Sequence, residues 1–140
     1  MSALVVDTSS WIAWLAGGGS PLVEDALEEG RLHVPVVVAA ELLSGRLDDS
    51  ERADLQDLLS DLPALGSDLE HWYRVGRLRA DLRARGLPVS TPDAHVAQCA
   101  LDVDGLLLTE DAVFGKIAHV APLRLAGAAE DPAWWAAPQK

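Results

Sequence analysis

Four acidic residues of this 140-residue chain occupy positions where a charged side chain is unexpected. Asp7 ends the apolar run "ALVVD", and Asp111 follows the apolar run "GLLLTE". Asp93 lies early in the helical pattern "STPDAHVAQCALD", and Glu41 interrupts the apolar segment "VVVAAELL". Carboxylates that converge repel each other unless a cation neutralises them, and such hard oxygen ligands suit Mg²⁺ or Mn²⁺. A bound ion of this kind can activate water against a phosphodiester, which is the chemistry that this set could perform.

Each acid also has a purely structural interpretation. Asp7 and Asp111 could accept hydrogen bonds from the N–H groups of the helices that follow them. Asp93 lies near a helix start, where the helix dipole favours a negative charge. Glu41 is harder to explain, because no basic residue lies three or four positions away and a charge buried alone is costly. We therefore interpret the four acids together, as one site.

Strands and helices alternate in the elements that must position these acids. Short apolar runs predict strands over 3–7, 31–35, 105–111 and 121–127. Helical spacing and end signals predict helices over 9–16, 21–30, 35–45, 48–62, 67–85, 90–102 and 112–120, the sixth with Thr91 as its cap. This alternation predicts an α/β fold, a three-layer α/β/α sandwich with a central, mostly parallel sheet. Ligands bind beyond the carboxyl ends of such strands, where Asp7 and Asp111 are expected.

Length and composition are typical of one globular domain. Hydrophobic residues make up 49% of the chain and charged residues 24%, and no apolar run approaches the roughly 20 residues that span a bilayer. We expect a single domain over residues 1–128, a C-terminal tail over 129–140, a cytoplasmic location and no membrane contact. The single cysteine, Cys99, lies in an apolar setting that is typical of a small core residue.

The histidines show no metal-binding pattern in the sequence. His95 lies two positions after Asp93, so on a helix it points about 160° away from that carboxylate. His33, His71 and His119 have no ligand spacing. Carboxylates are therefore the expected ligands.

Four motifs, in order, resemble those of PIN-domain ribonucleases, in particular the VapC-type toxins of bacterial toxin–antitoxin pairs. They are "VVDTSSWIAWL", "VPVVVAAELLSG", "STPDAHVAQCAL" and "LLLTEDAVF", the last carrying the pattern T-x-D-x-x-F. The resemblance extends over residues 3–125. It implies that the catalytic and metal-holding residues are Asp7, Glu41, Asp93 and Asp111, supported by Ser9 and Thr109.

The resemblance also implies an activity and partners. Such toxins cleave RNA endonucleolytically with Mg²⁺ or Mn²⁺, commonly structured RNA such as tRNA. They form homodimers and are silenced by a cognate antitoxin whose C-terminal segment lies across the active-site groove. Many members carry a further Asp where this chain has Val113, which leaves open whether one or two ions bind. The adjacent Glu110 is not expected to replace it, because neighbouring side chains at a strand end point in different directions.

The net charge of −11 argues against binding nucleic acid through the overall field of the protein. One segment, "RVGRLRADLRARG", is nevertheless rich in arginine and could contact RNA phosphates or the antitoxin. The alternative is a solvated helix face paired with acids such as Asp81. The arginines concerned are Arg74, Arg77, Arg79, Arg83 and Arg85.

Two other functions remain open from the sequence. Val113 is consistent with a PIN-like module that binds a partner without catalysis. The strand end "VVDTS" is also consistent with an aspartyl-phosphate phosphatase in which Asp7 is the nucleophile. That chemistry expects a second Asp where Ser9 stands, together with a supporting lysine, and the only lysines are Lys116 and Lys140.

Overall fold

Strands and helices alternate over residues 2–126, the part of the chain that our computed structural model describes. The strands are β1 (Leu4–Val6), β2 (Leu32–Pro35), β3 (Ala64–Leu65), β4 (Leu106–Leu108) and β5 (Arg124–Leu125). The helices are α1 (Thr8–Leu15), α2 (Pro21–Glu28), α3 (Val36–Leu43), α4 (Asp49–Ser60), α5 (Leu69–Ala84), α6 (Thr91–Asp102) and α7 (Ala112–Ala118). None of the described helices is both long and apolar enough to cross a bilayer.

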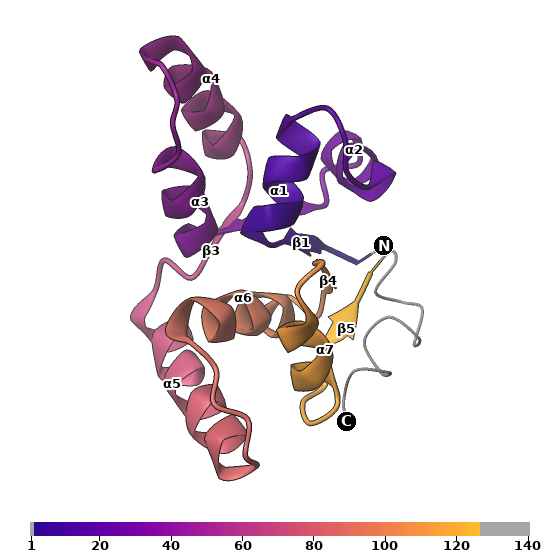
Figure 1. The fold of residues 1–140 in the computed structure, drawn as a ribbon, viewed down its shortest axis with the longest axis vertical. Coiled ribbons are helices and arrows are strands. Elements are labelled where there is room, and N and C mark those ends of the chain that lie inside the picture. Colours follow the sequence, from indigo (N-terminus) through magenta and orange to yellow (C-terminus); the bar gives the residue numbers. More distant parts are fainter. Residues whose placement is uncertain (1, 127–140) are drawn as a thin grey trace.

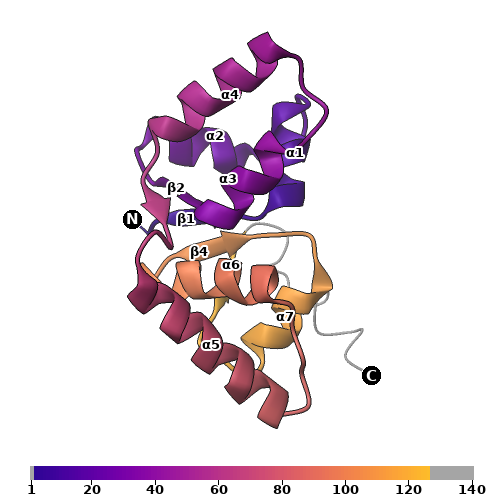
Figure 2. The same ribbon diagram turned by 90° about the vertical axis from the view of Figure 1, so that its left-hand side faces the viewer.

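The strands of residues 2–126 form one parallel sheet in the order β3-β2-β1-β4-β5. Figures 1 and 2 show this sheet between two helical layers, with α1 to α4 on one side and α5 to α7 on the other. The predicted α/β/α sandwich is therefore confirmed, and the sheet is wholly parallel. The chain steps outward from β1 to β3 and then returns to the other side of β1 for β4. Ligands bind at such a switch in strand order, here between β1 and β4.

Helix starts follow the sequence signals closely, with one correction, and one strand was not predicted. The Ser20 hydroxyl caps α2 and Pro21 is its first residue, as predicted. Helix α6 is capped by Ser90, one residue earlier than the predicted Thr91, and its hydroxyl accepts a backbone N–H from the first turn. Strand β3, Ala64–Leu65, was not predicted, because two residues are too short to show an alternating pattern.

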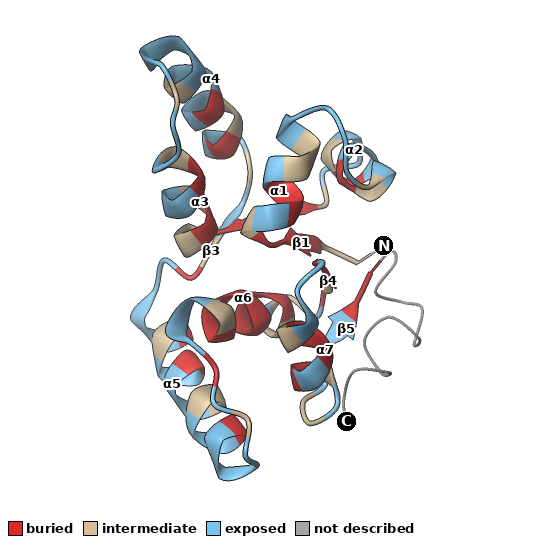
Figure 3. Ribbon diagram, in the orientation of Figure 1, coloured by how far each residue is buried: buried red, intermediate tan, exposed pale blue. Residues whose placement is uncertain are grey.

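The core lies along β1 and α6. Val5 and Val6 have no solvent exposure, and α6 is buried continuously from Ala94 to Ala100 (Figure 3). A strand buried on both faces can present polar groups to solvent only beyond its ends. The fold therefore leaves the carboxyl edge of the sheet as the place for chemistry. The predicted tail over 129–140 lies outside the described residues.

Candidate active site

The register of the two central strands brings Asp7 and Thr109 together. Val6 lies opposite Leu108, and the backbone N–H of Asp7 donates to the Leu108 carbonyl at 3.2 Å. The Thr109 hydroxyl donates a short hydrogen bond to Asp7 Oδ2 and accepts the backbone N–H of Asp111 at 3.0 Å. Thr109 thus connects two of the predicted acids, although 102 residues separate it from Asp7.

Asp7 is both a helix cap and a member of the site. Its Oδ1 accepts the Ser10 N–H at 3.0 Å, which caps α1, and the Ser9 hydroxyl at 3.2 Å. The side chain is nearly buried, with 6% of its surface exposed. Hydrogen bonds to both oxygens hold the carboxylate in one orientation, as a preformed ligand requires.

Glu41 reaches the site from a different environment than its sequence predicted. Helix α3 buries Val38 and Leu42, whereas Glu41 is exposed. The argument from a buried charge was therefore wrong, because a short helix with one buried face still leaves its other face to solvent. Glu41 Oε1 accepts a hydrogen bond from the Thr8 hydroxyl at 2.8 Å, which ties it to the turn after Asp7.

All four predicted acids line one cleft at the carboxyl edge of the sheet. The cleft has a volume of about 200 Å³. None of the salt bridges among the described residues involves any of these four carboxylates. The lining residues are Asp7, Thr8, Ser9, Glu41, Pro92, Asp93, Val96, Asp111 and Phe114.

The electrostatics of Asp93 show that the acids act on one another. Its pKa is raised above the ordinary value, first by burial and then by the charges of Asp111, Glu41 and Asp7. The Ser90 hydroxyl opposes this shift but does not cancel it. The ionised cluster is therefore strained in the absence of a cation, which is the condition under which a divalent ion binds well.

The donor set fits a hard divalent cation. Every ionisable side chain lining the cleft is a carboxylate, and no His or Cys contributes to its lining. Such oxygen ligands favour Mg²⁺ or Mn²⁺ over zinc. Val113 offers only its backbone N–H, which donates to Asp111 Oδ1 at 3.0 Å. Glu110 lines a separate pocket with Ser10 and so does not replace the absent acid.

The arginines of α5 do not line the acid cleft. Arg74 pairs with Asp102 at 2.8 Å, and Arg77 pairs with Asp81 at 3.2 Å. Arg79 donates to the Val89 carbonyl at 3.0 Å. Intramolecular partners thus occupy three of the five arginines that the sequence offered for RNA or antitoxin contact.

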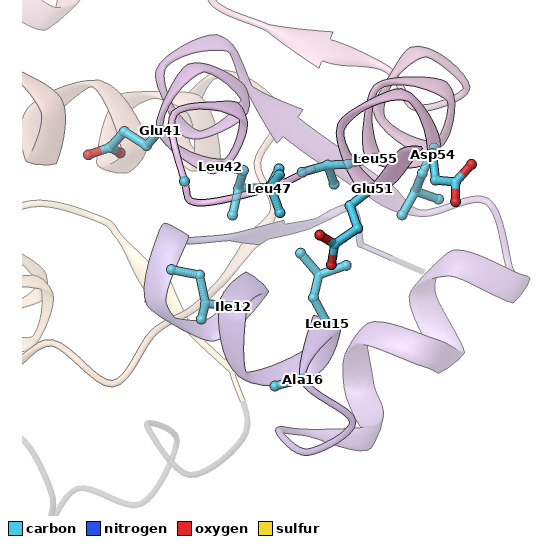
Figure 4. Close-up of a pocket in the computed structure, with 11 residues that line it drawn as sticks. Ile12, Leu15, Ala16, Glu41, Leu42, Leu47, Glu51, Asp54 and Leu55 are labelled. Atoms are coloured by element: carbon cyan, nitrogen blue, oxygen red, sulfur yellow. The ribbon is translucent and has the colours of Figure 1, made fainter. Parts of the chain in front are cut away.

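An apolar groove, which the sequence analysis did not identify, adjoins the cleft between α1, α3 and α4. It has a volume of about 600 Å³. Figure 4 shows Ile12 and Leu15 facing Leu42 and Leu55 across it. Ile12 and Leu15 are 56% and 44% exposed. Glu41 lines both the groove and the acid cleft, so the two adjoin at this residue.

This chain is similar to known proteins in sequence and in fold. Ribonuclease VapC11 of Mycobacterium tuberculosis is 29% identical over 130 residues, which cover 88% of this chain and 97% of that protein. The structure of DNA-bound VapBC from Salmonella typhimurium gives a TM-score of 0.74 at 21% identity, over 90% of this chain and 98% of that one. VapBC2 from Rickettsia felis, bound to a promoter DNA fragment, gives a TM-score of 0.70 at 17% identity, over 89% and 97%. Residues 4–120 match the PIN domain, most of the chain. The chain therefore belongs to the PIN-domain family.

Proposed function

We propose that this chain is a metal-dependent endoribonuclease and the toxin of a toxin–antitoxin pair. The observation that carries the proposal is the convergence of four carboxylates on one cleft, without a basic partner among the described residues. Membership of the PIN family supports it, as does similarity to proteins named VapC ribonucleases.

The carboxylates of the cleft differ in how firmly hydrogen bonds hold them, and we assign their roles from this difference. A bound Mg²⁺ or Mn²⁺ would supply Lewis acidity and an activated water. Asp7, oriented by Thr109 and Ser9, is the fixed ligand of the set. Glu41 is exposed and held by one hydroxyl, so it is the ligand best able to adjust as RNA enters. Asp93 and Asp111 complete the charge that holds the ion.

The substrate that we propose is structured RNA such as tRNA. An acidic cleft repels phosphates outside the reacting centre, so the RNA backbone needs basic contacts elsewhere on the protein. The Arg83 and Arg85 guanidinium groups make no hydrogen bond or ion pair with described residues. These two arginines, at the C-terminal end of α5 and at its C-cap, remain available for this role.

A matched pair of Glu-to-Gln variants tests the nuclease. We expect purified protein to cleave RNA with Mg²⁺ or Mn²⁺ and to stop in EDTA. Glu41→Gln should lose about 100-fold or more in rate, since even outer partners of metal ligands change activity by 10–100-fold. Glu28→Gln changes another exposed helical glutamate, which lies outside the cleft, and this variant should cleave as wild type does. Equal cleavage by both variants, or in EDTA, would contradict the proposal.

No structural observation favours the phosphatase alternative. The residue two positions after Asp7 is Ser9, whose hydroxyl donates to Asp7 instead of supplying an acid. Neither Lys116 nor any other basic residue lines the acid cleft. The Asp7 carboxylate is better arranged to hold an ion than to accept a phosphoryl group.

We propose that the apolar groove receives a segment of the antitoxin. Its apolar residues lie between the acids Glu41, Glu51 and Asp54, so a segment with apolar and basic side chains would match it. A segment seated there also reaches the acid cleft, because Glu41 borders both. Occupation of the groove would thus block access to the catalytic acids. We also propose a homodimer, as the resemblance implies, which sedimentation analysis can check.

The antitoxin is expected to be encoded by a short reading frame next to the gene for this chain. Measuring the affinity of this chain for that protein tests the proposed partner. Ile12→Glu places a charge in the groove and should weaken the complex about 100-fold. Leu69→Glu alters an equally apolar side chain, 63% exposed, at the start of α5 outside the groove. It should bind as the wild type does. Equal affinities for the two variants would place the antitoxin elsewhere.

A further inference from the structure

A chain of hydrogen bonds that is buried at its centre runs from α3 to the end of α6. The backbone N–H of Val37 lies 3.3 Å from His95 Nε2, and His95 Nδ1 lies 2.7 Å from His71 Nε2. His71 Nδ1 is in turn 2.6 Å from Asp102 Oδ2. Both imidazoles are fully buried. This cluster, the histidine relay, plays no part in the acid cleft chemistry described above.

The two ends of the relay fix the direction of every hydrogen bond in it. A backbone N–H can only donate, so His95 Nε2 accepts and its proton lies on Nδ1. The Nδ1–H of His95 then donates to His71 Nε2. The proton of His71 therefore also lies on Nδ1, from which it donates to the Asp102 carboxylate. The hydrogen-bond geometry therefore assigns the Nδ1–H tautomer to both rings.

A metal ion is the competing interpretation of the same side chains. The ligand atoms of His71, His95 and Cys99 all lie within 4.8 Å of one another. A metal on His95 Nδ1 would move the ring proton to Nε2, where it would face the N–H of Val37. Two donors would then oppose each other in a buried place. Burial also raises the pKa of the Cys99 thiol, which disfavours a thiolate ligand. The relay satisfies every group without an ion.

The His95 ring is held in place from several sides. Trp72 stacks on it, with ring centroids 4.6 Å apart and planes 4° from parallel. The Trp72 indole N–H donates to the Gly66 carbonyl at 2.8 Å. A Cβ on Gly66 would lie 2.5 Å from His95 Cε1, and the φ of Gly66 is +90°. This close backbone approach requires glycine, and it leaves the ring no room to turn.

The His95 ring connects α6, which carries the predicted ligand Asp93, to α3, which carries the predicted ligand Glu41. Val37 lies in the first turn of α3, whose N-cap, Pro35, has no side-chain acceptor to offer. His95 Nε2 therefore acts as the missing cap. Glu41 follows one turn later on α3, and Asp93 precedes His95 by two residues on α6.

We propose that His95 is a positioning residue, whose Nε2 lone pair caps α3 and so fixes where Glu41 stands relative to Asp93. The inference rests on the proposed function, in which these two carboxylates share an ion. It assigns to the histidine relay the task of setting their spacing. His95 itself touches neither ion nor RNA.

The tautomers give a spectroscopic test that does not depend on activity. In ¹⁵N-resolved NMR of the imidazole rings, wild-type protein should show the ring proton of His95 and of His71 on Nδ1. An Nε2–H tautomer at His95 would overturn the proposal, because that nitrogen could not accept from Val37. Stoichiometric zinc in the purified protein, measured by elemental mass spectrometry, would also overturn it.

Calorimetric titration with Mn²⁺ tests the effect on the cleft. His95→Leu removes the cap and should weaken Mn²⁺ binding about tenfold, the scale found for partners that orient metal ligands. His95→Gln can place an amide oxygen near the Nε2 position and should stay within about threefold of wild type. Cys99→Ala, a change in the same buried cluster that leaves the relay intact, should bind Mn²⁺ as wild type does.

The outcomes separate the two proposals. If the wild type binds no Mn²⁺, the proposed function fails. The NMR measurement of the histidine tautomers still tests whether His95 caps α3. If the wild type binds Mn²⁺ and His95→Leu binds it equally well, the positioning role alone is overturned. If His95→Leu does not fold, His95→Gln decides, and a tenfold loss in that variant contradicts the proposal.

Discussion

Two aspartates at opposite ends of α6 show opposite behaviour. The helix dipole should stabilise the charge of Asp93 in the first turn and destabilise that of Asp102 at the last residue. The pKa of Asp93 is instead raised, by burial and by three neighbouring acids. Burial alone would also raise the pKa of Asp102, yet hydrogen bonds from Arg74, His71 and Gln98 lower it. Local partners thus outweigh the dipole at both ends.

The contrast distinguishes a functional acid from a structural one. Asp102 is fully partnered and connects α5 to α6, so its charge stabilises the fold. Asp93 has like charges for neighbours, so its charge costs stability until a cation arrives. At the two ends of α6, the acid that lines the cleft faces like charges, whereas the structural acid is surrounded by hydrogen-bond donors.

The largest effect that would sharpen this contrast is on catalysis. Asp93→Asn should reduce kcat/KM for RNA by at least about 100-fold, because it removes a ligand charge. The same change should leave the metal-free fold at least as stable, since it relieves repulsion. Asp57→Asn, on an exposed face of α4, is the matched control and should change neither quantity. Single-turnover cleavage and chemical denaturation give the two measurements, and a large loss of stability in Asp93→Asn would break the contrast.

At the other end of α6, a change to Asp102 is expected to reduce the stability of the fold. Asp102→Ala leaves His71, Arg74 and Gln98 without their shared acceptor and should lower the free energy of unfolding by about 2 kcal/mol. Urea denaturation measures this loss. Asp57→Ala, which removes an exposed carboxylate from α4, provides the comparison and should cost much less. Similar losses in the two variants would mean that Asp102 is not a structural connection.

A divalent ion should stabilise the protein by binding in the acid cleft at the Asp93 end of α6, and not at the Asp102 end. At ten times its dissociation constant, Mn²⁺ should add about 1.4 kcal/mol to the free energy of unfolding, since it binds only the folded cleft. Asp93→Asn should remove most of this gain, whereas Asp102→Asn should retain it. Thermal melts with and without Mn²⁺ give the answer. An equal gain in all three proteins would place the ion outside the cleft.

The acid cleft was predictable from the sequence because most of the acids that line it follow local signals. Asp7, Thr109 and Asp111 stand at the ends of apolar strands, and parallel strands bring such ends to one edge. The exposure of Glu41 was not predictable from its apolar neighbours, because only packing decides which face of a short helix is covered. The four acids do line one cleft, although the premise about the burial of Glu41 was wrong, and their role as metal ligands stays a prediction.

The relay and the groove could not be predicted in the same way. His71 and His95 lie 24 residues apart on two helices, and nothing in either pattern states how those helices cross. The spacing of His95 from Asp93 placed His95 outside the acid cleft, as the cleft lining shows. The spacing did not reveal which groups His95 contacts by hydrogen bonds. Ile12 and Leu15 look like core residues in the sequence, and only the placement of α4 shows that they border a groove.

The smallest effect expected is a pH dependence that belongs to Asp102. Its folded-state pKa is lowered, so its contribution to stability is present above the ordinary aspartate pKa near 4 and is lost as the pH falls through the folded value. Asp102→Asn keeps the shape but cannot ionise, and should cost about 1 kcal/mol at pH 7, the difference between charged and neutral hydrogen bonds. The gap in urea-denaturation free energy between wild type and Asp102→Asn should therefore be constant from pH 7 to 5 and close below pH 4. A gap that closes already between pH 7 and 5 would assign the stabilisation to another group, and the two ends of α6 would no longer differ in the way proposed.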